Sequence, residues 1–600
     1  MPAKDIKNHT IKQLETLAEE IRKDIVSNVK NCGGHLSSNL GAVELTLALH
    51  KVFDFPKDKL IFDVGHQSYT HKLLTGRDLS RLRTKGGASG FPDPEESEYD
   101  AFAAGHSGTS VALGIGYCAA RDLRGGTEKV VCLIGDASLG NGAALESIFS
   151  SEKKPKNFVV VLNDNGMSID KNDSAFFKAI SKATAKKRYR KVNTVLSRTF
   201  KETSAFGKYL RKIKYSVKGW LNKNYFFERC GFKYVGPVNG HDLSELCAVL
   251  ENIRGIDEPV LLHAVTQKGR GYAAAEEDPS RYHGVSKDFE DSDNTFSAAL
   301  GNILLERAQK DTRLLAVTAA MTDGVGLASF AEKYPDRVFD AGICESFAVA
   351  MAAGMAKGGM RPVVCLYSTF LQRAYDQIVE EVCLSSLPVL FCVDRAGLVG
   401  ADGKTHQGLF DVSLLRGIPN LSVYAPKDAA EFADIFDYAL SKNAPAAIRY
   451  PNGVAPALGA RTQISDETLW EVLEEGEDVA VLASGARAVE RALRARELVF
   501  PLRPAVINCR TIKPLDEKML ASLAGKRLIA FEEGYAEGGF GSAAAEFFAE
   551  RNMPVSLKIM GAENTFVPHA RAQEQAEALR LSAQDLAAEI KKQFSEMQEK

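Results

Sequence analysis

The sequence predicts an α/β protein made of several domains, and two observations support this prediction. Short runs rich in β-branched residues alternate with longer stretches of helical periodicity through most of the chain. Apolar runs followed by helices are typical of parallel sheets whose strands are joined by crossover helices. The chain also has 600 residues, which is too long for one hydrophobic core, since domains usually contain about 100–200 residues.

Six strand-like runs follow one another along the chain. Each is short and apolar and is bounded by Gly or Asp, as expected of a strand that is buried on both faces. The predicted strands are Val130–Ile134, Phe158–Leu162, Val363–Tyr367, Val389–Val393, Val479–Ala483 and Arg527–Phe531. After them, Asp585–Phe594 has the spacing of an amphipathic helix that closes the chain.

Two segments look like joints between domains. Residues 284–296 are polar and acidic without periodicity, and residues 451 to about 468 mix Pro, Gly and polar residues before a new strand pattern begins. Such composition is typical of linkers between domains. The two joints divide the chain into blocks of comparable size.

The composition is that of an ordinary globular protein. Hydrophobic residues make up 45% of the chain and charged residues 25%, and the formal net charge is −2. A charge near zero gives no overall attraction to nucleic acid or to an anionic membrane. The N-terminus has no apolar core of a secretory signal and no apolar run could span a bilayer, so we expect a cytoplasmic protein. The ten cysteines, which include no Cys-x-x-Cys pair, are expected to be reduced packing residues.

One segment departs from this neutrality. From Lys178 to Lys223 there are fifteen Lys or Arg residues and a single acid, Glu202. Such a cluster could bind polyanions. We favour a solvated excursion of the first domain over residues 171–228, because its aromatic residues show no regular motif for stacking bases.

Two glycine patterns match the short form of a dinucleotide-binding motif. Gly114–Ala119 and Gly539–Ala544 both read Gly-x-Gly-x-x-Ala. A dinucleotide site also needs a strand before the glycines, a helix after them and a downstream acid for the ribose. The sequence indicates this context for neither pattern, so we interpret both as close helix packing or tight turns.

Two predicted strands end in side chains that carry oxygen. Asp136 follows the first of these strands, and Asn165 follows the second, twenty-nine residues later. The carboxyl ends of parallel strands lie at one edge of a sheet, so we expect the two side chains to lie side by side. Carboxylate and amide oxygens suit Mg²⁺, which prefers hard oxygen ligands. The alternative is that Asp136 only caps a helix and Asn165 only forms a turn.

Glu345 is the only acid in the segment Ala341–Gly354, which otherwise consists of small and apolar residues and one serine. An ionised carboxylate is costly to bury unless it is paired or its pKa rises. Glu345 is therefore either a proton carrier or a carboxylate that backbone amides satisfy at the start of a helix.

Longer motifs give the chain a resemblance to a known family. They are spread over almost its whole length, and the block Tyr367–Gly408 is far more specific than any short glycine pattern. With them the chain resembles the 1-deoxy-D-xylulose-5-phosphate synthases, which are transketolase-like thiamine diphosphate enzymes. The motifs are Gly34–Gly41, Asp63–Lys72, Gly236–His241, Lys268–Tyr272, Tyr367–Gln377 and Asp394–Gly408.

The resemblance implies a three-domain transketolase-like fold in which each domain is a mainly parallel sheet flanked by helices. A diphosphate- and Mg²⁺-binding domain would span residues 1–290, a pyrimidine-binding domain residues 291–460 and a C-terminal domain residues 461–600. A homodimer is implied as well. The family reaction decarboxylates pyruvate on thiamine diphosphate and condenses the two-carbon unit with D-glyceraldehyde 3-phosphate. Its products are CO₂ and 1-deoxy-D-xylulose 5-phosphate, which starts non-mevalonate isoprenoid synthesis and also feeds thiamine and pyridoxal synthesis.

The resemblance also implies roles for particular residues. Mg²⁺ would be held by Asp136, Asn165 and the backbone carbonyl of Met167, and Glu345 would hydrogen-bond a ring nitrogen of the aminopyrimidine. The other cofactor-binding residues would be His66, His106, Ser107, Gly108, Ala137, Ser138, Lys268 and Phe370. Substrates would be bound by His35, Tyr367, Arg395, Asp402, His406 and Arg449, and the catalytic groups besides Glu345 would be His35, His283, His406 and Asp402.

Plainer interpretations of some of these residues stay open. Phe370 could belong to the core, and most single histidines in proteins are structural. Arg449 could form a surface ion pair and Asp402 a turn. Arg373, in the same motif as Phe370, could either line the site or pair with an acid.

Several positions near the expected cofactor depart from the family pattern. Ala137 stands where the family has Gly, Gly166 where it often has Glu, and Gly105–Gly108 reads Gly-His-Ser-Gly. After Glu345 the chain has Ser-Phe where the family has Gln-His, and a phenyl ring has no nitrogen to carry a proton. Two alternatives to the synthase reaction follow: a related ketol transferase with another donor or acceptor, or a catalytically weak cofactor-binding protein.

Overall fold

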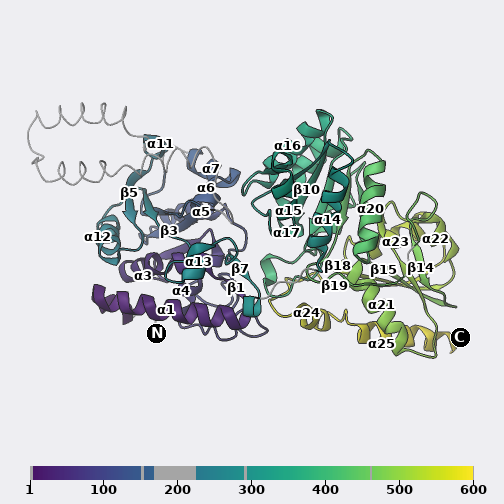
Figure 1. Cartoon of the computed structure of the whole chain (residues 1–600). Coiled ribbons are helices and arrows are strands. Elements are labelled where there is room, and N and C mark those ends of the chain that lie inside the picture. The colour runs from purple at the N-terminus through teal and green to yellow at the C-terminus, as the bar shows by residue number, and fades with distance from the viewer. Residues whose placement is uncertain (1–4, 151–153, 168–224, 290–293, 460–461, 599–600) are drawn as a thin grey trace, which may run out of the picture. The chain divides into compact units, whose positions relative to one another are not determined.

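The computed structural model describes residues 5–150, 154–167, 225–289, 294–459 and 462–598 (Figure 1). The basic segment 178–223 lies outside these residues. The chain divides into two compact units. Unit 1 contains Met1–Leu82 and Gly87–Glu290, and unit 2 contains Arg83–Gly86 and Asp291–Lys600.

Unit 1 is built on a five-stranded parallel sheet. Every residue of its central strands β3 and β4 is buried, as expected of a sheet that helices cover on both sides. The strand order is β2 (Lys59–Phe62), β3 (Val130–Gly135), β4 (Phe158–Asp164), β6 (Val260–Val265) and β5 (Lys233–Asn239).

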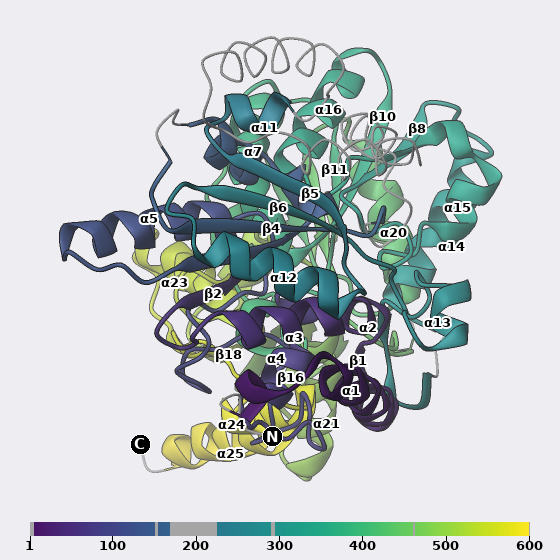
Figure 2. The same ribbon diagram turned by 90° about the vertical axis from the view of Figure 1, so that its left-hand side faces the viewer.

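Helices form a layer on each face of this sheet. Side chains of β3 alternate between the two layers, because successive strand residues point to opposite faces: Val131 and Leu133 join one core, and Val130 and Cys132 join the other. Figure 2 shows α3 and α12 on one side of the strands and α5 on the other. The first layer contains α1 (Ile11–Cys32), α3 (Val43–Val52) and α12 (Leu243–Arg254), and the second contains α5 (Ser110–Leu123) and α7 (Gly142–Phe149).

Several very short elements of unit 1 carry candidate site residues. The strand β1 (Gly34–His35) pairs antiparallel with β7 (Gly284–Val285). The other short elements are α2 (Ser37–Gly41), η2 (Gly65–Gln67), α4 (Tyr69–Leu74) and α6 (Asp136–Leu139). Each of these elements has at most six residues and is too short to be stable by itself. Side-chain hydrogen bonds to neighbouring segments must therefore hold them in position.

Unit 2 begins with a seven-stranded sheet. It is parallel except for the edge strand β17, which pairs antiparallel with β12. The strand order is β17 (Thr511–Lys513), β12 (Ser422–Tyr424), β13 (Ala446–Arg449), β11 (Leu390–Asp394), β10 (Arg361–Tyr367), β8 (Leu314–Thr318) and β9 (Val338–Asp340). Helix α16 (Glu345–Lys357) packs on one face, and α14 (Phe296–Ala308) and α20 (Ala429–Ser441) pack on the other.

The second sheet of unit 2 has five strands. Helices α21 (Ala486–Leu498) and α25 (Ala583–Gln598) cover one face, and α23 (Phe540–Glu550) covers the other. The strand order is β14 (Glu471–Glu474), β16 (Ala505–Asn508), β15 (Val479–Ser484), β18 (Arg527–Tyr535) and β19 (Ser556–Ala562). Since β17 follows β16 in the chain but joins the first sheet, residues after 461 share a sheet with residues before 460. The domain boundaries near 290 and 460 stay a prediction.

The predicted strands and closing helix are confirmed. All six apolar runs lie in strands, namely β3, β4, β10, β11, β15 and β18, with differences of a few residues at their ends, and the predicted C-terminal helix is α25. All ten cysteines are free. In the part of the chain that is described, no helix is both long enough and apolar enough to cross a membrane.

The interpretation of the two glycine patterns as close packing or tight turns is confirmed, although the second pattern has a context that the sequence did not indicate. Gly114 lies inside α5, where an added Cβ would approach Cys132 Sγ to 2.5 Å, so this glycine does serve close packing. Gly539, however, lies between β18 and α23 and therefore has the strand-loop-helix context that the sequence did not indicate. The Glu532 carboxylate accepts hydrogen bonds from the amides of Phe540 and Gly541 at 2.9 and 2.8 Å. A carboxylate of the chain itself thus occupies this helix start.

Candidate active site

The candidate residues form two groups, which we call the unit 1 group and the unit 2 group. The unit 1 group comprises His35, His66, His106, Ser107, Gly108, Asp136, Ala137, Ser138, Asn165, Met167, Lys268 and His283. The unit 2 group comprises Glu345, Tyr367, Phe370, Arg395, Asp402, His406 and Arg449. In each group, most residues lie at or just after the carboxyl ends of strands, where open parallel sheets bind ligands.

Asp136 and Asn165 follow the neighbouring strands β3 and β4, as predicted. Asp136 is the first residue of α6 and is only 2% exposed. Its Oδ2 accepts no hydrogen bond from any described residue. Burial, together with the nearby Asp164 carboxylate, raises the pKa of Asp136 to about 7. Because one buried oxygen lacks a donor, helix capping alone does not account for this side chain.

Asn165 takes part in a local turn. Its Oδ1 accepts a hydrogen bond from the amide of Met167 at 3.0 Å, which is the turn geometry considered as its alternative role. Among the described residues, no three His, Cys, Asp or Glu side chains are grouped as metal ligands. A cation at this sheet edge would therefore combine Asp136 with amide, backbone and ligand oxygens.

The loop before α5 carries His106, Ser107 and Gly108, and a buried carboxylate fixes its position. Asp63, just after β2, accepts hydrogen bonds from the amides of Gly108 at 2.7 Å and Ser110 at 2.9 Å. Burial raises the pKa of Asp63 even though these amides oppose the rise. Gly108 has φ +96°, and a Cβ there would lie 2.6 Å from the Asn141 side chain. The loop thus brings backbone close to the sheet edge at a position where only glycine fits.

Three histidines from separate segments of unit 1 form a cluster. The ring centroids are 5.0 Å apart for His35 and His66, 5.1 Å for His66 and His283, and 5.5 Å for His35 and His283. Burial, with the neighbouring Lys268 and the two other rings, lowers the pKa of His283 well below its usual value. His283 is therefore neutral at physiological pH.

Glu345 begins α16, where it is 3% exposed. The nearest cation is Arg373, whose Nη1 lies 3.8 Å from Glu345 Oε2. That same oxygen accepts no hydrogen bond from the residues that the structure describes. Burial raises the pKa of Glu345, although Arg373 opposes the rise. The residue thus lies at a helix start and has a carboxyl whose pKa is raised.

Adjacent strand ends of unit 2 place an aromatic ring beside an arginine. Tyr367 and Asp394 are paired in register at the ends of β10 and β11. The Arg395 guanidinium lies 4.2 Å from the centroid of the Tyr367 ring, and its Nη1 donates to Asp394 Oδ2 at 2.6 Å and to Ser297 Oγ at 3.0 Å. The arginine is therefore fixed by a carboxylate, a hydroxyl and an aromatic face.

Phe370 and His406 extend this aromatic cluster. Phe370, in α17 (Ser368–Leu371), is stacked on Tyr367 with centroids 5.7 Å apart and an angle of 9° between the rings. His406 meets Phe370 edge-on at 5.6 Å. Burial lowers the pKa of His406, so its ring is neutral at physiological pH. The rings form a continuous wall from Tyr367 to His406.

Two further residues of the unit 2 group are held by ion pairs. Asp402 receives a hydrogen bond from Arg83 Nη2 at 2.5 Å, and Arg83 belongs to the short segment of unit 2 that comes early in the chain. Arg449, at the end of β13, is 5% exposed and donates from Nε to Asp411 Oδ2 at 2.8 Å. Its Nη2 is buried and has no hydrogen-bond partner among the described residues. Arg449 is thus paired, but it is not part of a surface ion pair.

The carboxylates that hold these groups were not among the residues predicted from the sequence. Asp63 and Asp394 lie inside quoted motifs, so their position next to candidate residues was a usable signal. Asp411 lies thirty-eight residues from Arg449 and outside every motif. No sequence spacing indicates that pair.

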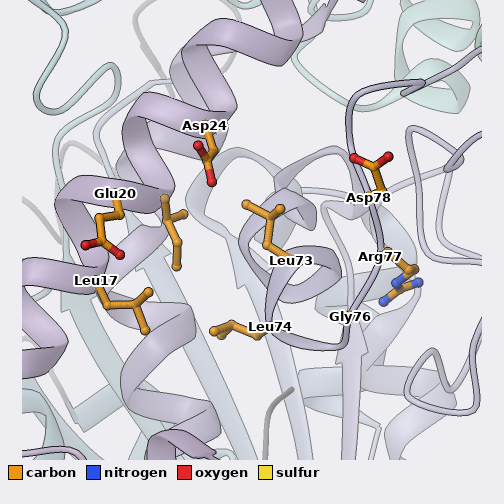
Figure 3. Close-up of a pocket in the computed structure, with 9 residues that line it drawn as sticks. Leu17, Glu20, Asp24, Leu73, Leu74, Gly76, Arg77 and Asp78 are labelled. Carbon is orange, nitrogen blue, oxygen red and sulfur yellow. The ribbon is translucent and has the colours of Figure 1, made fainter. Parts of the chain in front are cut away.

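One surface pocket lies apart from the residues of both groups. It has a volume of about 310 Å³ and lies in unit 1, between α1 and the segment that ends α4 (Figure 3). Its wall combines apolar side chains with acids, and none of the candidate residues lines it. The lining residues are Leu17, Glu20, Ile21, Asp24, Leu73, Leu74, Gly76, Arg77 and Asp78.

Comparison with known proteins gives a consistent result over the whole chain. The family described as 1-deoxy-D-xylulose-5-phosphate synthase matches residues 2–266, the transketolase pyrimidine binding domain matches residues 293–456, and the transketolase C-terminal domain matches residues 469–586. A 1-deoxy-D-xylulose-5-phosphate synthase of Syntrophomonas wolfei is 44% identical over 99% of this chain and 96% of its own. 1-Deoxy-D-xylulose-5-phosphate synthase 1 of Geobacter sulfurreducens is 43% identical over 97% of this chain and 95% of its own.

Proposed function

This chain belongs to the 1-deoxy-D-xylulose-5-phosphate synthase family, and we propose that it catalyses the reaction for which the family is named. Pyruvate is decarboxylated with thiamine diphosphate as cofactor, and the two-carbon unit is joined to D-glyceraldehyde 3-phosphate. The products are 1-deoxy-D-xylulose 5-phosphate and CO₂. The protein is thus a transketolase-type transferase, and the cytoplasmic location expected from its sequence is part of the same proposal.

The observation that carries this proposal is the environment of Glu345. It lies in the part of the chain that matches the pyrimidine binding domain of transketolase, and its Oε2 is buried without a hydrogen-bond donor among the described residues. A carboxyl with a raised pKa can hold a proton at a ring nitrogen of an aminopyrimidine. Arg373 limits the rise and keeps the ionised form accessible, so Glu345 can give up the proton and take it back.

The unit 1 group supports the binding of a diphosphate with Mg²⁺. The orphaned Oδ2 of Asp136 suits a hard cation, and Asn165 and the backbone carbonyl of Met167 would complete the protein's share of the ligands. The loop through Gly108, where only glycine fits beside the Asn141 side chain, would bring backbone towards the phosphate oxygens. Ala137 and Ser138 follow Asp136 in α6, and Lys268, which is 4% exposed, supplies a buried positive charge.

The bound cofactor would supply an electron sink for the carbanion that decarboxylation leaves. The histidines then have a separate task. Because His283 is neutral, the cluster of His35, His66 and His283 can donate hydrogen bonds to the pyruvate carboxylate and move protons without adding a fixed charge. His106 lies in the loop held by Asp63, where it can act on the same end of the cofactor.

The acceptor phosphate requires a fixed positive charge, and the unit 2 group contains two candidates. Arg395 is held rigidly by Asp394 and Tyr367, which orients its guanidinium for bidentate binding. Arg449 keeps one buried nitrogen without a hydrogen-bond partner in the described part of the chain. Asp402 and His406 would hydrogen-bond the aldehyde and its hydroxyl, and the ring of Phe370 would pack against the pyrimidine.

A homodimer is also part of the proposal. On α16, Phe347, Met351 and Met355 are four residues apart and share one helix face. Phe347 is 57% exposed in the single chain, so a second copy could bury it. Sedimentation should then give twice the chain mass of 65.2 kDa, and Phe347→Glu should shift the protein towards the monomer. A wild-type protein that sediments as a monomer at every concentration would contradict this part of the proposal.

The reaction is tested with the purified protein, thiamine diphosphate, Mg²⁺, pyruvate and D-glyceraldehyde 3-phosphate. We expect a product with the mass of 1-deoxy-D-xylulose 5-phosphate, equimolar CO₂, and no such product without the aldehyde. The Glu345→Ala variant serves as a control that should abolish turnover. If pyruvate is not consumed but a ketose phosphate is consumed as donor in its place, the protein is instead a related ketol transferase.

A further inference from the structure

The short helix α2 contacts all three segments that carry the clustered histidines. It directly follows His35 in the chain. Its Ser38 Oγ lies 3.1 Å from His283 Nδ1, and the amide of Leu36, just before α2, donates to the carbonyl of His283 at 3.2 Å. The third segment, around His66, is reached through a single side chain, that of Asn39.

Asn39 forms hydrogen bonds with both groups of its amide. Its Nδ2 donates to the carbonyl of His35 and to the carbonyl of His66, both at 2.6 Å. Its Oδ1 accepts from the amide of Tyr69 at 2.9 Å. Since Asn39 is fully buried, water does not compete for these bonds. One side chain therefore joins the backbones of two histidines that are thirty-one residues apart.

Tyr69 completes this arrangement. Its side chain is fully buried, and its hydroxyl accepts a hydrogen bond from the amide of His35 at 3.1 Å. A Cβ at Gly34 would lie only 2.8 Å from that hydroxyl, so the backbone before His35 packs directly on the tyrosine. His35 is thus held at its amide by Tyr69 and at its carbonyl by Asn39.

Only a side chain with two N–H donors and one acceptor can make the bonds of Asn39 at this size. An aspartate would direct an oxygen towards two carbonyl oxygens, and a leucine would remove all three hydrogen bonds that Asn39 makes to backbone groups. The requirement applies to the backbone positions of His35 and His66. Because each imidazole ring is attached to one of these backbone segments, the bonds of Asn39 also determine how the two rings face each other, with centroids 5.0 Å apart.

We propose that Asn39 is a positioning residue that sets the mutual placement of His35 and His66, with Tyr69 as its partner. This inference rests on the proposed function, in which the histidine cluster binds pyruvate and moves protons. Displacement of a reacting group by about 1 Å can reduce a rate by about 100-fold. Loss of Asn39 should therefore reduce turnover, although it touches neither substrate nor cofactor.

The first experiment compares Asn39→Ala with Asn508→Ala. Asn508 is also fully buried, and its Nδ2 donates one hydrogen bond, to Glu431 in unit 2. We expect both variants to lower the thermal midpoint, whereas only Asn39→Ala should lower kcat for pyruvate, by about 10- to 100-fold. The dissociation constant for thiamine diphosphate, measured by calorimetry, should change less than threefold. Equal kcat losses in the two variants would mean that Asn39 has only a general structural role.

A double-mutant cycle separates positioning from general damage. If Asn39 acts through His66, the loss caused by Asn39→Ala should shrink to less than threefold in a His66→Ala background. Full additivity would overturn the proposal. Should Asn39→Ala fail to fold, Tyr69→Phe tests the same link to His35, with Tyr535→Phe as its control. Tyr535 is also buried, and its hydroxyl bonds the carbonyl of Thr565 at 3.0 Å.

A measurement without substrates keeps this inference distinct from the proposed function. In protein labelled with ¹³C at histidine Cε1, the signals of His35 and His66 can be assigned from single His→Gln variants. Asn39→Ala should shift both signals and their titration midpoints, while Asn508→Ala should leave them unchanged. Shifted signals in a protein without turnover would reject the proposed function and keep the positioning role. Unchanged signals would reject the positioning role itself.

Discussion

The two groups of candidate residues hold their polar atoms in different ways. In unit 1 the histidine cluster is held by neutral partners: Asn39 donates to the carbonyls of His35 and His66, the Tyr69 hydroxyl accepts from the amide of His35, and Ser38 is hydrogen-bonded to His283. In unit 2 the two candidate arginines, and Arg373 beside Glu345, are each paired with a carboxylate. The pairs are Arg395 with Asp394, Arg449 with Asp411, and Arg373 with Glu345.

This difference indicates a division of tasks. Burial lowers the pKa of His283, so its ring carries no standing charge at physiological pH. For Arg395, burial acts in the same direction, but the Asp394 carboxylate outweighs it and raises the arginine pKa. The unit 1 group is therefore suited to proton movement at the donor substrate, and the unit 2 group to holding an anion. Glu345 is the exception in unit 2, because its pKa is raised.

The largest loss of kcat is expected when Glu345 is replaced. Glu345→Gln keeps the size of the side chain but removes the proton that can be transferred, so kcat should fall by about 100- to 10,000-fold. Thiamine diphosphate should still bind within about threefold of the wild-type affinity, as measured by calorimetry. The control is Glu546→Gln, which removes an exposed carboxylate paired with Arg416. A kcat within tenfold of wild type would mean that Glu345 is only a helix-start carboxylate.

The next largest loss of activity should concern the acceptor, D-glyceraldehyde 3-phosphate, and leave the binding of the donor, pyruvate, nearly unchanged. Arg395→Met removes a hydrogen bond to a charged group, worth about 1.5–3 kcal/mol, so kcat/KM for D-glyceraldehyde 3-phosphate should fall by about 10- to 150-fold. The KM for pyruvate should change less than threefold. Arg395→Lys keeps the charge but loses the planar fork, so it should give an intermediate loss.

The matched control for Arg395 is Arg313→Met. Arg313 also pairs with a neighbouring acid, Asp311, but is about half exposed. Initial rates at varied aldehyde concentration measure the effect. An equal loss of pyruvate affinity in Arg395→Met would place this arginine at the donor instead.

The fold could be predicted from the sequence because its signals are local. Val130–Ile134 is a continuous apolar run, since β3 is buried on both faces, and such a run needs no knowledge of the rest of the chain. The edge strand β17 has three residues and pairs antiparallel with β12, about ninety residues earlier. A strand this short has no periodicity, so only tertiary contacts determine it.

The candidate site could be predicted only in part. Glu345 stood out as a single acid among apolar residues, and the motifs marked the histidines and Arg395. The side chains that hold them could not be recognised. Asn39 lies in a quoted motif but gives no signal of its role, because its partners are backbone carbonyls that every residue carries. Asp411, the first residue of α19 (Asp411–Leu415), meets Arg449 at the end of β13 only in the tertiary structure.

A smaller effect, on stability, is expected from Glu532, a carboxylate of unit 2 that accepts hydrogen bonds from two backbone amides and forms no ion pair among the described residues. Burial raises the pKa of Glu532 to about 7 despite these amides, above the value of about 4.3 in an unfolded chain. Its contribution to stability is therefore present below pH 4 and is lost as the pH rises through 7. The free energy involved is about 4 kcal/mol at most.

Glu532→Gln tests this pH dependence. The variant cannot ionise, so the difference in thermal midpoint, wild type minus variant, should decrease as the pH rises from 5 to 8. Differential scanning calorimetry at fixed ionic strength measures it. A difference that stays constant or increases with pH would show that Glu532 is already ionised at pH 5.

The smallest effect is expected from Phe347→His, which restores the residue type of the family pattern. Two residues along an α-helix correspond to a rotation of about 200°, so position 347 faces away from Glu345 at position 345. Phe347 is also 57% exposed, whereas Glu345 is buried. An imidazole at 347 in the same chain therefore cannot share the environment of Glu345. The kcat for pyruvate and D-glyceraldehyde 3-phosphate should change less than threefold, in protein whose sedimentation mass is unchanged. An increase of tenfold or more at constant mass would mean that this helix face reaches the reacting groups, and that unit 2 also contributes a neutral proton carrier.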